Sequence, residues 1–447
     1  MSLFIDGKEI SSFHFVGILG IGMSAIAQYL AKDCLVGGSD RSIGNSRDEE
    51  ILKNQGLSIF LQDGSGICEK TQVVVVSTAI ENDNPDIKKA KELNIPILHR
   101  SEVLAAIVKK HYSVSVTGTS GKSSVSAMIF HILDFAGKKP SFIGGANLHS
   151  LRKKNLLGNA FRGNGEILVI EADESDGTVV RYFPKISVLL NISRDHKEIS
   201  EVVSLLKTAS NQSNLTIYNK DDKNFEGFEG KSFGFSRNAD YFPIRYSLAE
   251  DSSTFTTESG VSFVLNFTGE HTVKNALAAL AVCKELQIDE KTITKALSTY
   301  GGIARRFDKY PASRNILVID DYAHNPEKIA AAISAAQMRK TPLSVVFQPH
   351  GFGPLKFMFD DLKNMFLKTL RPIDKLYLLS TFYAGGTADK SLDSDKLAEE
   401  LKTVFVKNRQ ELSEILKKEV KENETVLICG ARDNSLSDFA KELAKVL

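Results

Sequence analysis

The chain has 447 residues, with 56 Lys and Arg against 55 Asp and Glu, and 42% of its residues are hydrophobic. This composition is typical of a globular protein and excludes a disordered, fibrous or disulfide-stapled chain. The formal net charge of +1 argues against a nucleic-acid or anionic-membrane partner, because such partners select a strong basic excess. At roughly 100–200 residues per domain, the length indicates about three domains.

The sequence also indicates a cellular compartment. The four cysteines lack metal-finger or CxxC spacing, so we expect reduced thiols at Cys34, Cys68, Cys283 and Cys429. The N-terminus has no basic segment followed by an apolar run, and no stretch of about 18 apolar residues occurs. We therefore expect a cytoplasmic protein without a membrane partner, as a monomer or weak homodimer.

Short apolar runs alternate with amphipathic stretches along the whole chain, which predicts an α/β fold of parallel sheets covered by helices. We place three domains at residues 1–110, 111–312 and 313–447. In the first domain, the predicted strands are 13–20, 34–40, 72–80 and 94–100, with a helix at 23–33.

The second and third predicted domains show the same alternation of strands and helices. A strand, a glycine loop and a helix span residues 113–133, and residues 167–175 and 186–196 continue that sheet. The pattern becomes β-like from about 214 to 268, before a helix at 270–286. A strand, turn and helix at 314–337 begin the third domain, which receives further strands from TPLSVVFQPH, DKLYLLSTFYAGG and ETVLICGARDN.

The most informative segment is the loop Gly118-Thr119-Ser120-Gly121-Lys122-Ser123-Ser124, between a predicted strand and helix. Its glycines let backbone N–H groups approach a polyphosphate, Lys122 can bridge phosphates, and Ser123 can reach magnesium. Val116 occupies the position where the usual GxxxxGK[ST] pattern requires glycine. A Gly/Ser turn with a solvated lysine is the structural alternative.

Acidic residues follow two strands of the same predicted sheet: Glu171, Asp173, Glu174, Asp176 and Asp195-His196. Carboxylate and imidazole ligands beside a phosphate loop would hold Mg²⁺. The alternative is a solvated acidic loop, most of all for Asp176.

The first domain contains a glycine turn, Gly17-x-x-Gly20-x-Gly22, with Asp40 ending the next strand. Leu19 breaks the GxGxxG spacing, so this turn predicts either the binding of a nucleotide diphosphate or tight packing alone. A nicotinamide dehydrogenase would explain only this part of the chain.

A polar turn in the third domain, Asp320 to Pro326, follows a strand and precedes a helix. Its acids can hold a ribose hydroxyl or a metal-bound water, and His324 can meet a phosphate. Arg305 and Arg306, before this domain, suit the charge of a transferring phosphoryl group. The alternative is a helix cap at Asn325 with a surface histidine.

Together these segments resemble the Mur ligases, the ATP-dependent amide ligases of peptidoglycan synthesis, over all three domains. The similarity is greatest to the branch that adds L-alanine, and it is carried by VGILGIGMSAIA, GSD, STAI with DNP, HRSEVLA, VTGTSGKSS, EADESD, NISRDH, GEHTVKNALAALA, RRFD, DDYAHNP and FQPH. The resemblance implies a Rossmann-like UDP-sugar domain, a P-loop ATPase-like central domain that binds ATP and Mg²⁺, and a Rossmann-like C-terminal domain for the amino acid. It implies ligation of L-alanine or a related amino acid to UDP-N-acetylmuramate through an acyl phosphate, and hence a role in cell-wall biogenesis, cell shape and division.

The resemblance also assigns residues. Those for the UDP-sugar are Gly17, Gly20, Gly22, Met23, Ser24, Asp40, Ser77, Thr78, His99 and Arg100. Those for ATP are Gly118, Thr119, Ser120, Gly121, Lys122, Ser123, Ser124, His271, Asn275, Arg306 and Asp321, with Ser123, Glu171 and His196 on the metal. Lys122, His196, Arg306 and His324 would act on the reacting phosphate, and the third-domain residues would reach ATP only when the domains close.

The acceptor segment departs from the family pattern. The L-alanine ligases carry arginines after FQPH, whereas here Lys356 is the nearest cation and Arg432 stands where a glycine is expected. We therefore expect Tyr322, His350, Lys356 and Arg432 at the acceptor site, with Arg432 or Lys356 holding the amino-acid carboxylate. A murein-recycling ligase that attaches a peptide, and a nucleotide-binding regulator that has lost ligation, are the alternatives.

Overall fold

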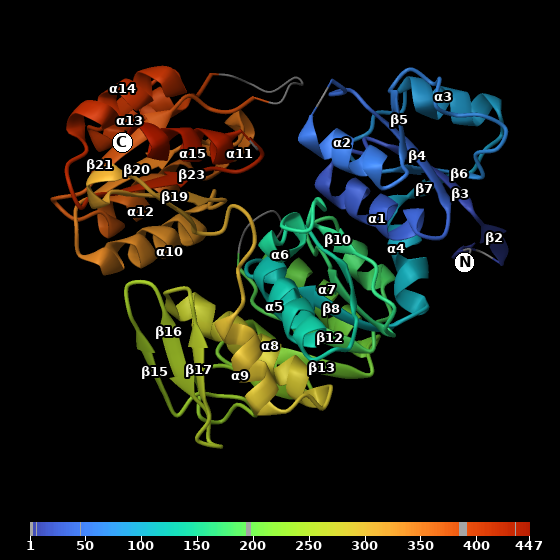
Figure 1. The fold of residues 1–447 in the computed structure, drawn as a ribbon, viewed down its shortest axis with the longest axis horizontal. Helices are drawn as coiled ribbons and strands as arrows, with labels where there is room; N and C mark the ends of the chain where they lie inside the picture. Colours follow the sequence, from blue (N-terminus) through green and yellow to red (C-terminus); the bar gives the residue numbers. More distant parts are fainter. Residues whose placement is uncertain (1–2, 6, 45, 194–197, 384–390, 434) are drawn as a thin grey trace. The chain divides into compact units, whose positions relative to one another are not determined.

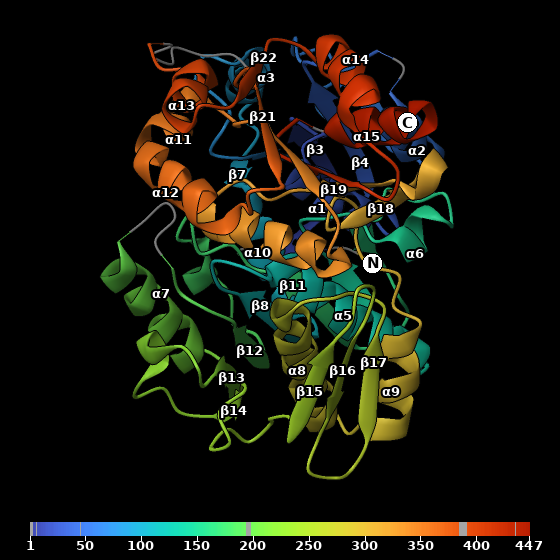
Figure 2. The same cartoon turned by 90° about the vertical axis from the view of Figure 1, so that its left-hand side faces the viewer.

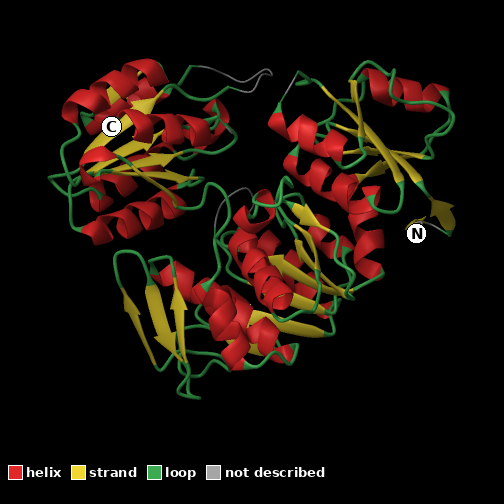
Figure 3. Cartoon of the chain, in the orientation of Figure 1, coloured by secondary structure: helices red, strands yellow, loops and turns green. Residues whose placement is uncertain are grey.

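The computed structural model describes residues 3–5, 7–44, 46–193, 198–383, 391–433 and 435–447. They form two compact units, each described here by itself. The first contains residues up to Ser247 with Thr254–Asn266 and Thr272–Ile303, and the second contains Leu248–Ser253, Phe267–His271 and Ala304–Leu447. The predicted α/β class is confirmed: helices cover sheets that are largely parallel (Figure 1, Figure 3).

The N-terminal part of the first unit is a parallel five-stranded sheet in the order β5-β4-β3-β6-β7. Its strands are β3 (Ser12–Val16), β4 (Leu35–Asp40), β5 (Ser58–Leu61), β6 (Val73–Val76) and β7 (Ile97–His99). Its helices are α1 (Ile21–Ala31), α2 (Arg47–Asn54), α3 (Pro85–Glu92) and α4 (Arg100–Lys109). Helices on both faces explain why β6 is a run of four valines. The antiparallel hairpin of β1 (Leu3–Ile5) and β2 (Lys8–Ile10) was not predicted.

The central part of the first unit is a seven-stranded sheet in the order β10-β9-β11-β8-β12-β13-β14, in which β10 is antiparallel to β9. Its strands are β8 (Tyr112–Thr117), β9 (Ser141–Ile143), β10 (Ala160–Phe161), β11 (Ile167–Glu171), β12 (Ile186–Leu189), β13 (Leu215–Asn219) and β14 (Lys231–Phe233). Its helices are α5 (Lys122–Phe135), α6 (His149–Arg152) and α7 (Ile199–Asn211), with 3₁₀ turns η1 (Thr178–Arg181) and η2 (Lys223–Phe225). Because β11 and β12 flank β8 in parallel, the polar residues after all three strands lie at one edge of the sheet.

The β-like segment forms a three-stranded sheet of β15 (Arg245–Leu248), β16 (Ser253–Thr256) and β17 (Ser262–Leu265). The helices α8 (Glu270–Glu285) and α9 (Glu290–Ser298) follow it, and α9 packs against both β17 and α5 (Figure 2). The predicted helix at 270–286 is therefore confirmed within one residue.

The second unit is built on a six-stranded sheet in the order β18-β19-β23-β20-β21-β22. Its strands are β18 (Asp308–Pro311), β19 (Leu317–Asp321), β20 (Leu343–Phe347), β21 (Lys375–Leu379), β22 (Val404–Val406) and β23 (Thr425–Cys429). Its helices are α10 (Pro326–Ala336), α11 (Phe352–Phe357), α12 (Phe359–Thr369), α13 (Ser394–Leu401), α14 (Arg409–Glu419) and α15 (Leu436–Val446), with 3₁₀ turns η3 (Ser313–Asn315) and η4 (Gln337–Arg339).

Two cores lie on opposite faces of this sheet. Ile319 packs with α10, α12 and α13, whereas its neighbour Val318 packs with α14 and α15. This alternation is the period of two that a strand buried on both faces requires. The antiparallel edge strand β18 belongs to this sheet although it precedes residue 312, and it was not predicted.

The described part of the chain contains no helix that is long and apolar enough to cross a membrane.

Candidate functional site

The predicted nucleotide loop joins the end of β8 to the start of α5. Gly118 and Gly121 have φ values of +132° and +90°, which residues with a side chain rarely adopt. A methyl group at Gly118 would lie 2.9 Å from the backbone N and O of Asn191, so glycine is also required for space. Gly121 is the N-cap of α5, and the backbone N–H groups that follow it form the kind of helix N-terminus that binds phosphate.

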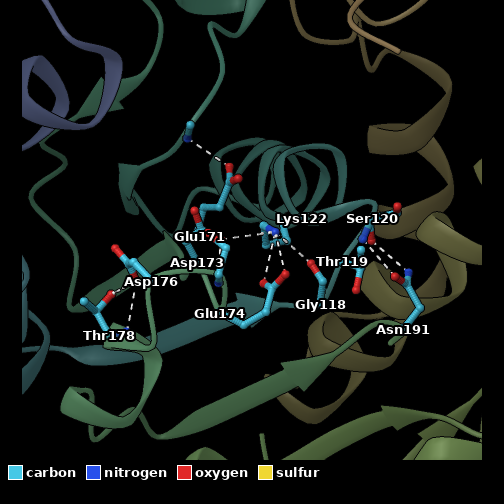
Figure 4. A network of polar contacts seen from close by, with 12 residues as sticks. Gly118, Thr119, Ser120, Lys122, Glu171, Asp173, Glu174, Asp176, Thr178 and Asn191 are labelled. Atoms are coloured by element: carbon cyan, nitrogen blue, oxygen red, sulfur yellow. Dashed lines mark hydrogen bonds and ion pairs between the residues drawn. The ribbon is translucent and has the colours of Figure 1, made fainter. Parts of the chain in front are cut away.

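Asn191 holds this loop from the neighbouring strand end. Its Oδ1 accepts from the Ser120 backbone N at 2.8 Å, and its Nδ2 donates to the Ser120 carbonyl at 2.8 Å (Figure 4). Its backbone carbonyl accepts from Thr119 N at 3.0 Å. Sequence reasoning did not assign this residue, although it lies in the quoted NISRDH segment directly after β12.

Lys122, the first residue of α5, lies among carboxylates from the loop after β11. Its Nζ is 3.0 Å from Oε2 of Glu174 and 3.6 Å from Oδ1 of Asp173, and it donates to the Gly118 carbonyl at 2.8 Å (Figure 4). Burial alone would lower the pKa of Lys122, but Glu174, Asp173 and Glu171 raise it above its usual value. The ammonium is therefore charged at neutral pH, as phosphate binding requires.

The residues expected to hold a metal are only partly described. Ser123 is buried in the first turn of α5, and Glu171 ends β11, where its Oε2 accepts from Gly145 N at 2.9 Å. His196 lies outside the described residues. Within those that are described, no group of three His, Cys, Asp or Glu could hold a metal ion. Hydroxyl and carboxylate oxygens are ligands that suit Mg²⁺, which also takes waters and phosphate oxygens.

Two residues of α8 were expected near the nucleotide. A methyl group at Gly121 would lie 2.8 Å from Oδ1 of Asn275, so the structure places Asn275 against the nucleotide loop. His271 is an exposed residue of the first turn of α8, and it belongs to the second unit.

The residues expected to bind the UDP-sugar follow β3, β4, β6 and β7, whose parallel pairing brings their carboxyl ends to one edge. Gly17 (φ +80°) follows β3, and Gly20 is the N-cap of α1, which contains Gly22 and the buried Met23 and Ser24. Ser77 and Thr78 follow β6 at a half-buried and an exposed position.

Both carboxylate oxygens of Asp40, at the end of β4, accept hydrogen bonds from backbone N–H groups. Its Oδ2 accepts from Leu19 N and its Oδ1 from Ser42 N, both at 3.0 Å. These contacts fix the glycine turn. Ser24 likewise has a structural contact, because its Oγ accepts from Nδ2 of the buried Asn159 at 2.9 Å.

His99 and Arg100 start α4. His99 is the N-cap in a capping box with Glu102, and burial together with the charge of Arg100 lowers its pKa, so the ring is neutral at pH 7. Arg100 donates through Nη2 to Oδ2 of Asp176 at 2.8 Å. Asp176, considered a solvated acid from the sequence, is instead only 15% exposed and paired.

In the second unit, the two arginines before β18 surround Tyr322. Both guanidinium carbons lie over its ring, at 5.1 Å for Arg305 and 5.4 Å for Arg306. Arg305 is buried and donates to the carbonyls of Gly430 and Asp433. Asp321, at the end of β19, accepts from the backbone N of Phe307 and of Ala323, and burial raises its pKa. The structure thus gives Arg305 hydrogen bonds within the second unit, and Arg306 remains the arginine that we expect to bind ATP.

His324 and His350 form a pair. Their ring centroids are 4.8 Å apart in an edge-to-face arrangement, and Nδ1 of His324 contacts the Tyr322 carbonyl at 2.9 Å. Burial, with the nearby charge of Lys328, lowers the pKa of His324 to about 2. Because the Tyr322 carbonyl can only accept, the one proton of the neutral ring lies on Nδ1. Nε2 is then an acceptor, and the ring cannot supply a positive charge.

The expected cations of the acceptor site differ in their setting. Lys356 is an exposed residue of α11. Arg432 follows β23 with φ +63°, so the backbone keeps the left-handed conformation of the glycine expected there. The backbone N of Arg432 lies 3.3 Å from the hydroxyl of Tyr322, which brings two of the predicted acceptor residues together.

Family models match three segments of the chain. The Mur ligase family catalytic domain matches residues 12–112, the Mur ligase middle domain matches residues 116–283, and the Mur ligase glutamate ligase domain matches residues 305–432.

Whole-chain relatives agree with these matches. A UDP-N-acetylmuramate–L-alanine ligase of Aquifex aeolicus is 33% identical over 460 residues, which cover 98% of this chain and 98% of that protein. An enzyme of the same name from Hydrogenovibrio crunogenus is 32% identical over 456 residues, which cover 95% of this chain and 96% of that protein.

Solved structures share the fold. The crystal structure of a UDP-N-acetylmuramate–alanine ligase from Thermotoga maritima superposes with a TM-score of 0.82 at 26% identity, covering 97% of this chain and 98% of that chain. A murein peptide ligase from Psychrobacter arcticus shares the fold at a TM-score of 0.69, with 18% identity and coverage of 97% and 98%. The chain belongs to the Mur ligase family.

Proposed function

We propose that this chain joins L-alanine to the carboxylate of UDP-N-acetylmuramate in peptidoglycan precursor synthesis, with ATP as the energy source. The proposal rests on the nucleotide loop, which Asn191 holds by hydrogen bonds and in which Lys122 is charged. The chain that contains this loop matches an L-alanine ligase over 98% of its length. It works in the cytoplasm as a monomer or weak homodimer, without nucleic acid or membrane.

ATP binds at the loop Gly118–Ser124. The helix N-terminus and Lys122 neutralise its phosphates, and Asn275 and His271 on α8 face the nucleotide. Phosphoryl transfer depends on positioning and charge neutralisation more than on covalent help from the protein, so these contacts supply most of what the step needs.

Mg²⁺ is the second cofactor. The hydroxyl of Ser123, the carboxylate of Glu171 and the imidazole of His196 would hold it. When bound, the ion neutralises the phosphate oxygens that gain charge during transfer.

The UDP-sugar binds at the edge formed by the glycine turn, Ser77, Thr78, His99 and Arg100. Its carboxylate oxygen attacks the γ-phosphorus of ATP, the bond from that phosphorus to the β–γ bridging oxygen breaks, and ADP leaves. The product is an acyl phosphate. Arg306, Asp321 and His324 of the second unit complete the site on the phosphate side, and their approach excludes water that would hydrolyse this mixed anhydride.

The amino acid binds beside Tyr322 and His350. Its amine attacks the acyl carbon, a tetrahedral intermediate collapses, phosphate leaves with its bridging oxygen, and the amine loses a proton. Arg432 or Lys356 holds the carboxylate of the amino acid. Arg432 is favoured because its backbone contacts Tyr322 and because a guanidinium pairs with a carboxylate through two parallel hydrogen bonds.

The test is product mass. The purified chain is incubated with ATP, Mg²⁺ and UDP-N-acetylmuramate labelled with ¹⁸O in its carboxylate, together with L-alanine, glycine, L-serine or the recycling tripeptide in separate reactions. We expect the L-alanine adduct and phosphate carrying one ¹⁸O. A tripeptide adduct alone would identify a recycling ligase, and ATP binding without any adduct would identify a regulator.

A further inference from the structure

One ion pair joins the expected UDP-sugar edge to the loop that carries the partners of Lys122. Arg100 begins α4 in the N-terminal part of the first unit, and Asp176 lies 76 residues later in the EADESD loop of the central part. Among the described residues, Asp176 is the one carboxylate that pairs with Arg100. The side chains are 24% and 15% exposed, so water screens this pair only partly.

Asp176 is held firmly on its own side. Its Oδ1 accepts from the backbone N of Thr178 at 3.0 Å and from the Thr178 hydroxyl at 2.6 Å, which leaves Oδ2 for Arg100. The Thr178 hydroxyl is itself 3.4 Å from that of Tyr182, and both side chains are buried. The position of the Asp176 carboxylate is therefore fixed by Thr178.

Arg100 is also constrained, and the Nη1 group of its guanidinium remains for a ligand. The capping box at His99 fixes its backbone, and Asp176 takes Nη2 alone. Nη1 lies at the glycine turn: a methyl group added to Gly22 would be only 3.2 Å from it. The N–H groups of Nη1 can donate to phosphate oxygens at this turn.

We propose that Asp176 is a positioning residue for the UDP-sugar: its bond to Nη2 orients Arg100 so that Nη1 donates to a phosphate of the uridine diphosphate group. Asp176 does not touch the substrate. It removes the orientational freedom of a long side chain before binding, and this preorganisation raises affinity without a new contact. The inference rests on the proposed function, because it requires that this edge bind a UDP-sugar.

The chain offers a matched control. Arg162 and Asp33 form another ion pair between the N-terminal and central parts, at 3.0 Å, with side chains 19% and 25% exposed. It contacts neither the glycine turn nor the EADESD loop through any described hydrogen bond. Asp33→Asn therefore measures how much ligand affinity falls when one such ion pair is broken while Arg100 keeps its orientation.

The experiment is a double-mutant cycle read by calorimetric binding of UDP-N-acetylmuramate, of UDP and of ADP to Asp176→Asn, Arg100→Gln, the double variant and Asp33→Asn. We expect Asp176→Asn to weaken binding of both uridine ligands by about five-fold or more, with ADP affinity within about two-fold of wild type. The double variant should bind no more weakly than Arg100→Gln, because Asp176 acts through Arg100. Asp33→Asn should bind like wild type.

Two results would overturn the inference: losses that multiply in the double variant, or an Asp176→Asn variant that binds like Asp33→Asn. If Asp176→Asn fails to fold, Asp176→Glu replaces it, and its longer side chain should still weaken the uridine ligands selectively, whereas unchanged affinity overturns the inference. Wild-type protein that binds ADP but neither uridine ligand would refute the proposed function itself, which separates the two failures.

Discussion

Nζ of Lys122 lies 3.0 Å from Oε2 of Glu174, a residue 52 positions further along the chain, and it also donates to the Gly118 carbonyl at 2.8 Å. These acceptors and the second oxygen of Glu174, at 3.3 Å, occupy the three protons of the ammonium. A phosphate that binds Lys122 must therefore displace at least one of these acceptors, and two of the three are oxygens of Glu174.

Glu174→Gln removes the charge that competes with phosphate, so we expect tighter binding of ADP in the absence of Mg²⁺. The free energy of ADP binding should become more favourable by about 1 kcal/mol, which calorimetry would detect as a roughly five-fold lower Kd. Asp173→Asn is the control, because Asp173 lies 3.6 Å from Lys122 and is 43% exposed, so its effect should stay below about two-fold. Weaker ADP binding by Glu174→Gln would show that Glu174 supports the nucleotide instead of competing with it.

Asn191→Ala removes both side-chain hydrogen bonds to Ser120 and should loosen the nucleotide loop. At about 1 kcal/mol per bond, we expect the Kd for ADP to rise roughly ten-fold or more, with UDP binding unchanged. Asn211→Ala, at the exposed end of α7, should leave both affinities unaltered. Wild-type ADP affinity in Asn191→Ala would show that Asn191 does not contribute to nucleotide binding.

The nucleotide loop shows what can be predicted from the sequence. The glycines at 118 and 121, Lys122 and the following helix were predicted because strand, loop and helix are consecutive, and local geometry follows from local sequence. The roles of Asn191, Glu174 and Asp176 were not predicted, because their partners lie 52 to 76 residues away and are set by strand order. Nothing in a single sequence distinguishes a paired acid from a solvated one.

The edges of sheets were missed for a related reason. β18 and β22 are the edge strands of their sheet and have only four and three residues, so neither carries an apolar run as long as those of the buried strands. Their pairing is decided by the sheet that they border. The buried strands β8, β11, β19, β20 and β23 carry such runs and were all predicted.

His324 should remain neutral over the whole working range, because burial and neighbouring cations lower its pKa to about 2. Its folded pKa is below the ordinary value of 6.5, so the unfolded state binds the extra proton, and His324 reduces stability progressively as the pH falls below about 6.5. The loss approaches about 1.4 kcal/mol per pH unit for this one group.

Two measurements check this expectation. In ring-carbon NMR spectra, the signal assigned to His324 by its loss in His324→Gln should not titrate between pH 5 and 9. Urea unfolding of His324→Gln between pH 6.5 and 5 should be less sensitive to acid than that of wild type. A titration midpoint near 6.5 would contradict the burial of this ring.

Arg432→Ala tests the acceptor site. If Arg432 holds the amino-acid carboxylate, the apparent KM for the amino acid should rise by roughly ten-fold or more, since a charge-assisted pair contributes about 1.5–3 kcal/mol, while the KM for ATP stays within about two-fold. Lys356→Ala is the matched variant, and the larger selective effect identifies the residue that holds the carboxylate. Equal changes in both KM values would exclude Arg432 from this role.

The measurement that tests the central claim most directly is phosphate release from ATP and Mg²⁺, with UDP-N-acetylmuramate and L-alanine supplied together and singly, and with Lys122→Ala as the control. The account predicts release only when both substrates are present, and none above background from Lys122→Ala. Release by wild type without either substrate, or none with both, would contradict the assignment as an L-alanine-adding ligase.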